Sequence, residues 1–439
     1  MWWKIAVVSC LLIGASQITE TAENDSKVVC YYDSRAFVRE GLGKVTLADI
    51  EPGLGQCTHL VIGFASINEQ KRVVSLNPLR DLDHGNRLYR EATFLRSKFP
   101  KLKVLLGIGY DVSGDPEKWL QMLETSTARI AFINSAYDLI KTYAFDGIDL
   151  AFEFPKIKVK KQRGSVGSFF YSIKKAVGAA GKPVDAKFEE HREEFTSLIR
   201  ELKNSFRHDG YLLSFTLNPN VNSSLYLDVP QIINNIDWVN IAAFDVQTPL
   251  RNKEEADYAA PLYKPSERNP ELNIDFQVTD LLARGVPTSK IVVGIPTFAR
   301  AWKIEDGATS TGVPPLKADG PTDEGIESKQ EGLFSYKEVC GMLTNPQNKD
   351  LKGERGPVRK VGDPSKRFTP YGFRLPDKDG KFGLWMAYED PDSAGNKAAY
   401  VRGKNLGGVS IMDLTYDDFR GTCTGDKFPI LKSAKYRLM

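Results

Sequence analysis

Eight short runs of apolar and β-branched residues recur along the chain, and patterns typical of helices separate them. Parallel strands need crossover connections, usually helices, so strand and helix alternate in folds with a parallel sheet. Eight such pairs predict an α/β fold in which the sheet closes as a TIM (β/α)8 barrel. The expected strands are residues 28–32, 59–65, 103–108, 146–153, 212–217, 238–244, 291–297 and 408–413.

Nucleotide and metal sites have little support in the sequence. No G-x-G-x-x-G or G-x-x-x-x-G-K-[ST] pattern follows an expected strand, so we expect no nucleotide and no other cofactor. The histidines are scattered without ligand spacing, which argues against a metal site. They are His59, His84, His191 and His208.

Two connections between strands are longer than a barrel requires. The first contains a basic insertion loop, residues 156–187, ahead of a helix pattern that ends at Phe206. The second, residues 299–385, is rich in Gly and Pro and predicts a small α+β insertion domain between the seventh and eighth strands. The barrel is then expected to comprise residues 27–298 and 386–439.

The N-terminus reads as a secretory signal over residues 1–16, with cleavage between 15 and 22. No later run approaches about 20 apolar residues, so we expect an exported protein without a membrane span. Cys10 leaves with the signal, and an oxidising compartment suggests two disulfides among the rest, in any of three pairings. Four buried free thiols are the alternative. The remaining cysteines are Cys30, Cys57, Cys340 and Cys423.

Charge is balanced overall, with 59 Lys and Arg against 56 Asp and Glu, so nothing points to nucleic acid. The loop at 156–187 is the exception, since it holds nine basic residues and one acid, Asp185. We expect it to engage an acidic glycan or a receptor surface, unless it is a solvated loop balanced by the acidic helix that follows. Its first basic residues are Lys156, Lys158, Lys160, Lys161 and Arg163.

Two triplets fit the acceptor pattern for N-glycosylation, at Asn24 and Asn222. Asn24 is close to the N-terminus, so Asn222 is the preferred site.

The strand expected within Phe145–Pro155 carries acids. Side chains alternate along a strand, so Asp149, Ala151 and Glu153 share one face, about 7 Å apart, while the residues between them point to apolar packing. Carboxylates in such a row are costly unless a ligand, proton or partner uses them. This strand therefore predicts a site.

Several segments together resemble the family 18 glycoside hydrolases, the chitinases. Residues 145–155 are similar to their D-G-x-D-x-D-x-E catalytic strand, beginning with Asp146, and 290–300 (KIVVGIPTFAR) and 406–419 (LGGVSIMDLTYDDF) to their last two strands. The resemblance implies a barrel and a substrate-assisted mechanism, in which the final glutamate protonates the leaving oxygen and the preceding aspartate orients the substrate acetamide. Glu153 occupies the acid position, and Ala151 that of the aspartate.

Other positions depart from the same pattern. The supporting Tyr-Asp pair reads Phe244-Asp245, and the floor tryptophan is Met412. The G-G-W of the third strand becomes Gly109-Tyr110-Asp111. Sugars bind by stacking on aromatic rings, so these changes imply a degenerate site.

Within this family the chain resembles the insect imaginal disc growth factors most, through Ala151, residues 218–224 (NPNVNSS) and residues 417–425 (DDFRGTCTG). That resemblance implies disulfides Cys30–Cys57 and Cys340–Cys423. It also implies a secreted, non-catalytic growth factor that promotes proliferation, polarisation or motility with insulin-like signals, through an unidentified cell-surface receptor.

Two alternatives stay open. One is a lectin-like protein that binds N-acetylglucosamine oligosaccharides through surviving aromatics. The other is a weak chitinase, because this chain retains Glu153 where many of these growth factors have glutamine. The candidate tryptophans for the lectin are Trp119, Trp238, Trp302 and Trp385.

Overall fold

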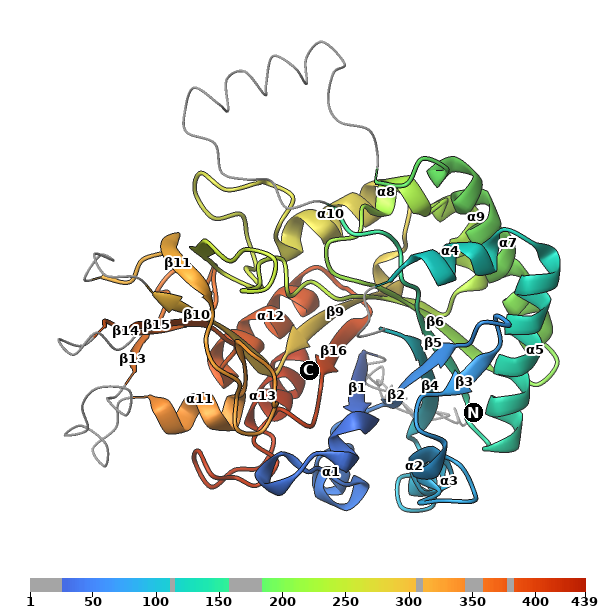
Figure 1. Ribbon diagram of the computed structural model, residues 1–439, viewed down its shortest axis with the longest axis horizontal. Helices are drawn as coiled ribbons and strands as arrows, with labels where there is room; N and C mark the ends of the chain where they lie inside the picture. Colours follow the sequence, from blue (N-terminus) through green and yellow to red (C-terminus); the bar gives the residue numbers. More distant parts are fainter. Residues whose placement is uncertain (1–25, 111–114, 158–183, 305–310, 344–357, 377–382) are drawn as a thin grey trace, which may run out of the picture.

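A computed structural model describes residues 26–110, 115–157, 184–304, 311–343, 358–376 and 383–439. Eight parallel strands form a closed barrel in the order β1-β16-β9-β7-β6-β5-β4-β2, and β2 pairs with β1 to complete it (Figure 1). The barrel predicted from the sequence is confirmed. Its strands are β1 (Lys27–Asp33), β2 (His59–Ile67), β4 (Lys103–Gly109), β5 (Gly147–Ala151), β6 (Leu212–Leu217), β7 (Trp238–Ile241), β9 (Ile291–Pro296) and β16 (Gly408–Met412).

Helices follow the strands and surround the barrel, apart from α11, which accompanies the segment between β9 and β16 (Figure 1). They are α1 (Leu47–Leu54), α2 (Pro78–Asp81), α3 (Leu88–Phe94), α4 (Glu117–Leu123), α5 (Ser126–Thr142), α7 (Phe188–Phe206), α8 (Ser223–Tyr226), α9 (Val229–Ile232), α10 (Ile274–Ala283), α11 (Tyr336–Met342), α12 (Pro391–Gly403) and α13 (Pro429–Leu438). Among the described residues, none of these helices has the length and apolar character needed to cross a bilayer.

The two faces of β5 and its continuation pack differently, as strand alternation requires. Phe152 points outward, where its ring centroid lies 5.3 Å from those of Trp119 and Phe195. Phe154 stacks on Tyr226 at 4.4 Å. These contacts belong to the large apolar layer between the strands and the helices. The opposite side chains are thereby directed into the barrel.

A second sheet lies beside the barrel and is formed mainly by the segment between β9 and β16 (Figure 1). Its strands run in the order β13-β14-β15-β10-β11-β8, with β12 paired to β10, and every pairing is antiparallel. The strands are β10 (Phe298–Ile304), β11 (Leu316–Pro321), β12 (Leu333–Ser335), β13 (Arg359–Val361), β14 (Tyr371–Arg374) and β15 (Gly383–Ala387). The remaining strand, β8 (Glu255–Ala256), comes from the connection between β7 and α10 and was not expected from the sequence. A short hairpin strand, β3 (Val73–Ser75), extends the barrel sheet at β2.

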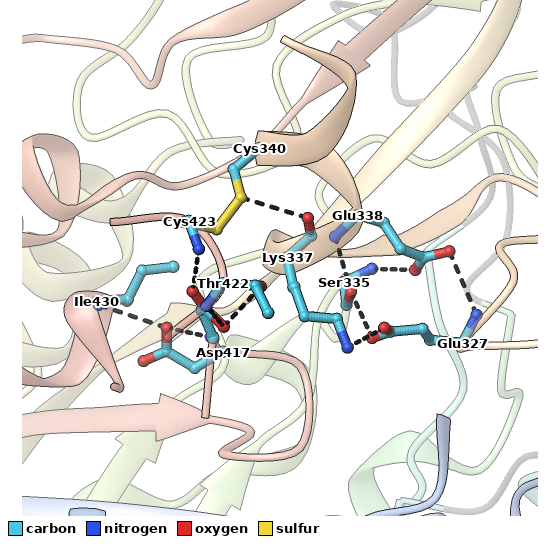
Figure 2. The surroundings of a disulfide bond; sticks show 10 residues. Glu327, Ser335, Lys337, Glu338, Cys340, Asp417, Thr422, Cys423 and Ile430 are labelled. Atoms are coloured by element: carbon cyan, nitrogen blue, oxygen red, sulfur yellow. Dashed lines mark hydrogen bonds and ion pairs between the residues drawn. A yellow bond between two sulfur atoms is a disulfide. The ribbon is translucent and has the colours of Figure 1, made fainter. Parts of the chain in front are cut away.

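Both disulfides implied by the resemblance are present. Cys30 on β1 is bonded to Cys57, which lies just before β2, and their Cα atoms are 5.9 Å apart. Cys340 on α11 is bonded to Cys423 in the segment after β16. Figure 2 shows the second bond beside the start of α11, where Ser335 and Glu338 form a capping box. The bond therefore joins the second sheet's helix to the C-terminal segment of the barrel.

Candidate functional site

One carboxylate lies at the centre of the barrel interior, that of Asp149 on β5. It is fully buried and accepts hydrogen bonds from Ser214 (2.6 Å) and Thr216 (2.8 Å) on β6. Tyr31 on β1 and Asn240 on β7 donate to the same carboxylate over 3.0 Å each. Side chains from several strands thus converge on one acid, which is how a buried charge is accommodated in a protein interior.

Burial raises the pKa of the Asp149 carboxyl above its usual range, and the surrounding hydrogen-bond donors oppose that rise. Burial also raises the pKa of the Tyr31 hydroxyl, so this hydroxyl stays protonated and remains a donor. All the partners in this network are side chains of barrel strands. Asp149 therefore holds the β1, β6 and β7 side chains that surround it in fixed positions inside the barrel.

Glu153 and Ala151 complete the row predicted from the sequence. β5 ends at Ala151, and Glu153 follows it as a buried side chain at the C-terminal end of the barrel, which we call the barrel mouth. Asn218, just after β6, donates to Glu153 Oε1 over 3.2 Å. Enzymes with this fold carry their reactive groups at this end. The row thus presents an acid at the mouth with a methyl group, at Ala151, as its inner neighbour.

Asp245 lies after β7, and both of its oxygens are bound by one arginine. Arg300 on β10 donates from Nε to Oδ1 over 2.7 Å and from its terminal nitrogen to Oδ2 over 2.6 Å. This fork-shaped pairing is the geometry that favours arginine over lysine as a carboxylate partner. The sequence gives no sign of it, because 55 positions separate the partners. Asp245 is thus held in an internal ion pair.

Phe244 and Met412 contribute apolar surface where the related pattern has a hydroxyl and an indole. Both are buried and belong to the apolar cluster inside the barrel. The Phe244 ring meets Phe298 edge to face at 5.8 Å and borders a cavity of about 10 Å³. A cavity of that size has room for about one water molecule.

Asp146 does not join this group, although the sequence motif begins with it. It precedes β5, at the opposite end of the strand from Glu153. Its carboxylate accepts the Val104 main-chain N–H at 2.8 Å and pairs with Arg96 at 3.1 Å. We therefore place Asp146 outside the site, because strand direction puts it at the N-terminal end of the barrel.

Other predicted positions lie apart from the barrel mouth or beyond the described residues. Asn222 is exposed and caps α8, where its Oδ1 accepts the Ser224 main-chain N–H at 3.1 Å. Lys156 forms an isolated β-bridge with Val221. The following positions lie outside the described residues: the signal segment 1–16, Asp111, Lys158, Lys160, Lys161 and Arg163.

The tryptophans considered for sugar stacking are core residues. Trp119, Trp238, Trp302 and Trp385 are all fully buried. Trp238 is part of the barrel interior, and Trp302 and Trp385 belong to the core of the second sheet. Within the described ranges, no group of three or more His, Cys, Asp or Glu side chains is arranged to hold a metal ion.

Two further acids meet at the barrel mouth, Asp33 at the end of β1 and Asp413 just after β16. Burial and the charge of Asp33 raise the pKa of Asp413 to about 6. Burial acts in the same direction on Asp33, but Arg35 outweighs it and lowers the pKa of Asp33. Arg35 binds that carboxylate through Nε, at 2.8 Å to Oδ1. Arg39 and Thr415 also lower the pKa of Asp413, but they do not outweigh burial and the charge of Asp33.

This difference predicts a pH dependence of stability. Because the pKa of Asp413 is about 6 in the folded state against an ordinary 3.8, the folded protein holds a proton there that the unfolded chain releases. Stability should therefore fall as pH rises through this window. We expect Asp413→Asn to raise the free energy of unfolding at about pH 7.5 by roughly 1 to 3 kcal/mol and to have little effect near pH 4.

Urea unfolding at several pH values measures this effect, with the disulfides intact. The matched control is Asp426→Asn, because Asp426 is an exposed aspartate of the same C-terminal segment. An equal stability change for Asp413→Asn at both ends of the pH range would contradict the prediction.

Comparison with known proteins places the chain in a family. The family described as "Glycosyl hydrolases family 18" matches residues 27–417. Chitinase-like protein Idgf4 of Glossina morsitans morsitans is 52% identical over 424 residues, covering 95% of each chain. Chitinase-like protein Idgf4 of Drosophila melanogaster is 51% identical over 442 residues, covering 99% of this chain and 100% of the relative. The Group IV chitinase of Ostrinia furnacalis, in complex with allosamidin, superposes with a TM-score of 0.77 at 25% identity, covering 94% and 98%. The chain therefore belongs to the glycosyl hydrolases family 18 and, within it, groups with the chitinase-like imaginal disc growth factors.

Proposed function

We propose that the protein is a secreted, non-catalytic growth factor that promotes cell proliferation, polarisation or motility, together with insulin-like signals, through a cell-surface receptor. The observation that carries the proposal is Ala151, whose methyl group stands beside Glu153 where a substrate-assisted mechanism needs a carboxylate. The relatives named as chitinase-like Idgf proteins support the same conclusion.

The chemistry explains why Ala151 matters. In the substrate-assisted reaction a positive charge develops on the cyclic intermediate, and a neighbouring carboxylate stabilises it while accepting the acetamide N–H. A methyl group does neither. Losing one such electrostatic contact costs about 10² to 10³ in rate. Phe244 removes a second supporting hydroxyl, and Asp245 is already bound at both oxygens by Arg300.

Other features of the chain support an extracellular role. The signal-like N-terminus and the two disulfides are typical of an exported protein. Asn222 is exposed at the start of a helix, so its side chain is accessible for glycosylation. The basic loop at 156–187 supplies a candidate surface for the receptor or for an acidic glycan.

The retained acid favours weak residual hydrolysis as a second candidate. Glu153 is buried at the barrel mouth with Asn218 as a donor, at the end of the barrel where enzymes of this fold carry their acids. The lectin-like alternative has lost its expected stacking surface, because the four tryptophans weighed for it are core residues.

One experiment separates these functions. Purified native protein, Glu153→Gln and Ala151→Asp are compared for release of reducing ends from chitin oligomers and for proliferation or motility of cultured insect cells. We expect no turnover by the native protein and an equal cell response with Glu153→Gln. Turnover that disappears in Glu153→Gln and rises in Ala151→Asp would establish the weak chitinase instead. Absence of any cell response would contradict the growth-factor proposal.

A further inference from the structure

Tyr110 occupies an unusual backbone position at the barrel mouth. It follows Gly109, the last residue of β4, and has φ +49°, in the left-handed region that side chains other than glycine rarely adopt. Its main-chain N–H donates to the carbonyl oxygen of Ala151 over 3.2 Å. A non-glycine residue in this conformation costs about 1 to 2 kcal/mol. The position is thus one where glycine would be easier to accommodate, yet it carries a large aromatic ring.

That ring continues a line of aromatic side chains from the barrel centre to its mouth. The Tyr31 and Phe64 rings are nearly parallel, with centroids 6.3 Å apart, and the Tyr110 ring lies 5.2 Å beyond Phe64 at 30°. Tyr31 is the residue whose hydroxyl donates to Asp149. The line therefore starts at the polar centre of the barrel and ends above it.

The line of aromatic rings belongs to a larger apolar cluster inside the barrel. Tyr110 packs against the interior apolar cluster, which includes Phe244 after β7, Phe298 on β10 and Met412 on β16. Tyr110 as a whole residue is only partly buried. The apolar cluster inside the barrel thus extends to the barrel mouth, where Tyr110, the residue after β4, packs against it.

Charged groups of the barrel mouth influence the hydroxyl of Tyr110. Burial raises its pKa far above the usual range, and the charges that act on it are Asp245, Arg300, Arg35 and Glu153. The main-chain bond of Tyr110 to the Ala151 carbonyl oxygen places Tyr110 at the end of β5, two residues before Glu153.

We infer that Tyr110 is a built-in occupant of the barrel mouth, whose ring takes the place of a sugar ring and keeps N-acetylglucosamine oligomers out. In the related G-G-W pattern this position is a glycine, so Tyr110 adds an aromatic ring at the barrel mouth where that pattern has no side chain. The inference rests on the proposed function, since it takes the mouth to be inherited from a sugar-cleaving site. It adds a steric barrier to the missing chemistry at Ala151.

Removing the ring should open the mouth to sugar. Tyr110→Gly removes the side chain and suits the left-handed backbone, and Tyr110→Asn is a second small residue that tolerates it. We expect both variants to bind the N-acetylglucosamine tetramer at least about tenfold more tightly than the native protein, since the Phe64 ring, which contacts the Tyr110 ring, becomes available for stacking. Tyr110→Phe keeps the ring and is the matched control, expected to bind no better than native.

Isothermal calorimetry with that tetramer measures the effect, and urea unfolding verifies that each variant is folded. The inference is overturned if the folded Gly and Asn variants bind no more tightly than native, if Tyr110→Phe binds as well as they do, or if neither small variant folds. Reducing-end release is measured on the same samples. Binding accompanied by turnover would support the steric role of Tyr110 and contradict the proposal of a non-catalytic site, so the two failures are distinguishable.

Discussion

Replacing both Cys340 and Cys423 by alanine is expected to lower the free energy of unfolding by about 4 to 5 kcal/mol. The bond spans 83 residues, from α11 through the second sheet and β16. Closing so long a segment removes many conformations from the unfolded chain, and the loss of entropy grows with the logarithm of its length. Both cysteines are only half-buried, so lost packing contributes little. Urea unfolding under oxidising conditions measures the change.

The single variants provide the control. Cys340→Ala and Cys423→Ala each remove the same bond, so each alone should cost nearly as much as the double variant. Costs that instead add up in the double variant would show that side-chain packing, and not the crosslink, accounts for the stability. The shorter Cys30–Cys57 crosslink spans 27 residues and is expected to contribute about 1 kcal/mol less through chain entropy.

Lys397→Met is expected to destabilise the protein by about 3 to 5 kcal/mol. Lys397 on α12 forms an ion pair with Glu389, and both side chains are almost completely buried. The ammonium group also donates to the carbonyl oxygen of Ala260 over 2.8 Å. Burial raises the pKa of Glu389 and lowers that of Lys397, and their mutual attraction opposes both shifts. Methionine leaves the carboxylate buried with Ser393, at 2.6 Å, as its remaining donor.

A double variant tests the electrostatic reason. Lys397→Met combined with Glu389→Gln has no buried charge at this pair, so it should regain a large part of the stability lost in Lys397→Met. Thermal or urea unfolding of the three proteins at neutral pH gives the comparison. A double variant no more stable than Lys397→Met would show that the shape of the lysine side chain, rather than its charge, is what the fold needs.

The barrel was predictable because its signal is local. Most of the eight runs are mainly apolar over five or more residues, the run at 146–153 alternates acids with apolar residues, and helix patterns recur between the runs. The alternation along β5 likewise placed Glu153 on the interior side, although the regular strand ends two residues earlier, at Ala151. The alternation of side-chain direction continues for the two residues after β5, so the Glu153 side chain still points to the interior side beyond the end of the hydrogen-bonded strand.

Contacts between distant segments were not predictable in the same way. Arg300 binds Asp245 across 55 positions, and Asn218 reaches Glu153 across 65. Nothing in the local sequence of either partner encodes the other, because the barrel's closure alone brings them together. For Asp146 the sequence predicts a proximity that the structure does not have. The motif groups it with Glu153 in sequence, but the length of β5 separates them to opposite ends of the barrel.

The edge strand β8 makes the second sheet depend on a segment outside the insertion between β9 and β16. Glu255 and Ala256 pair with Lys317 and Leu316 of β11, although they are encoded some sixty residues earlier, between β7 and α10. A fragment cut at residues 298 and 387 would expose the bare edge of β11, and such edges are templates for association with other chains. Transferring this sheet to another barrel therefore requires two separate pieces of the sequence. One is the segment between β9 and β16, and the other is the connection after β7 that contains β8.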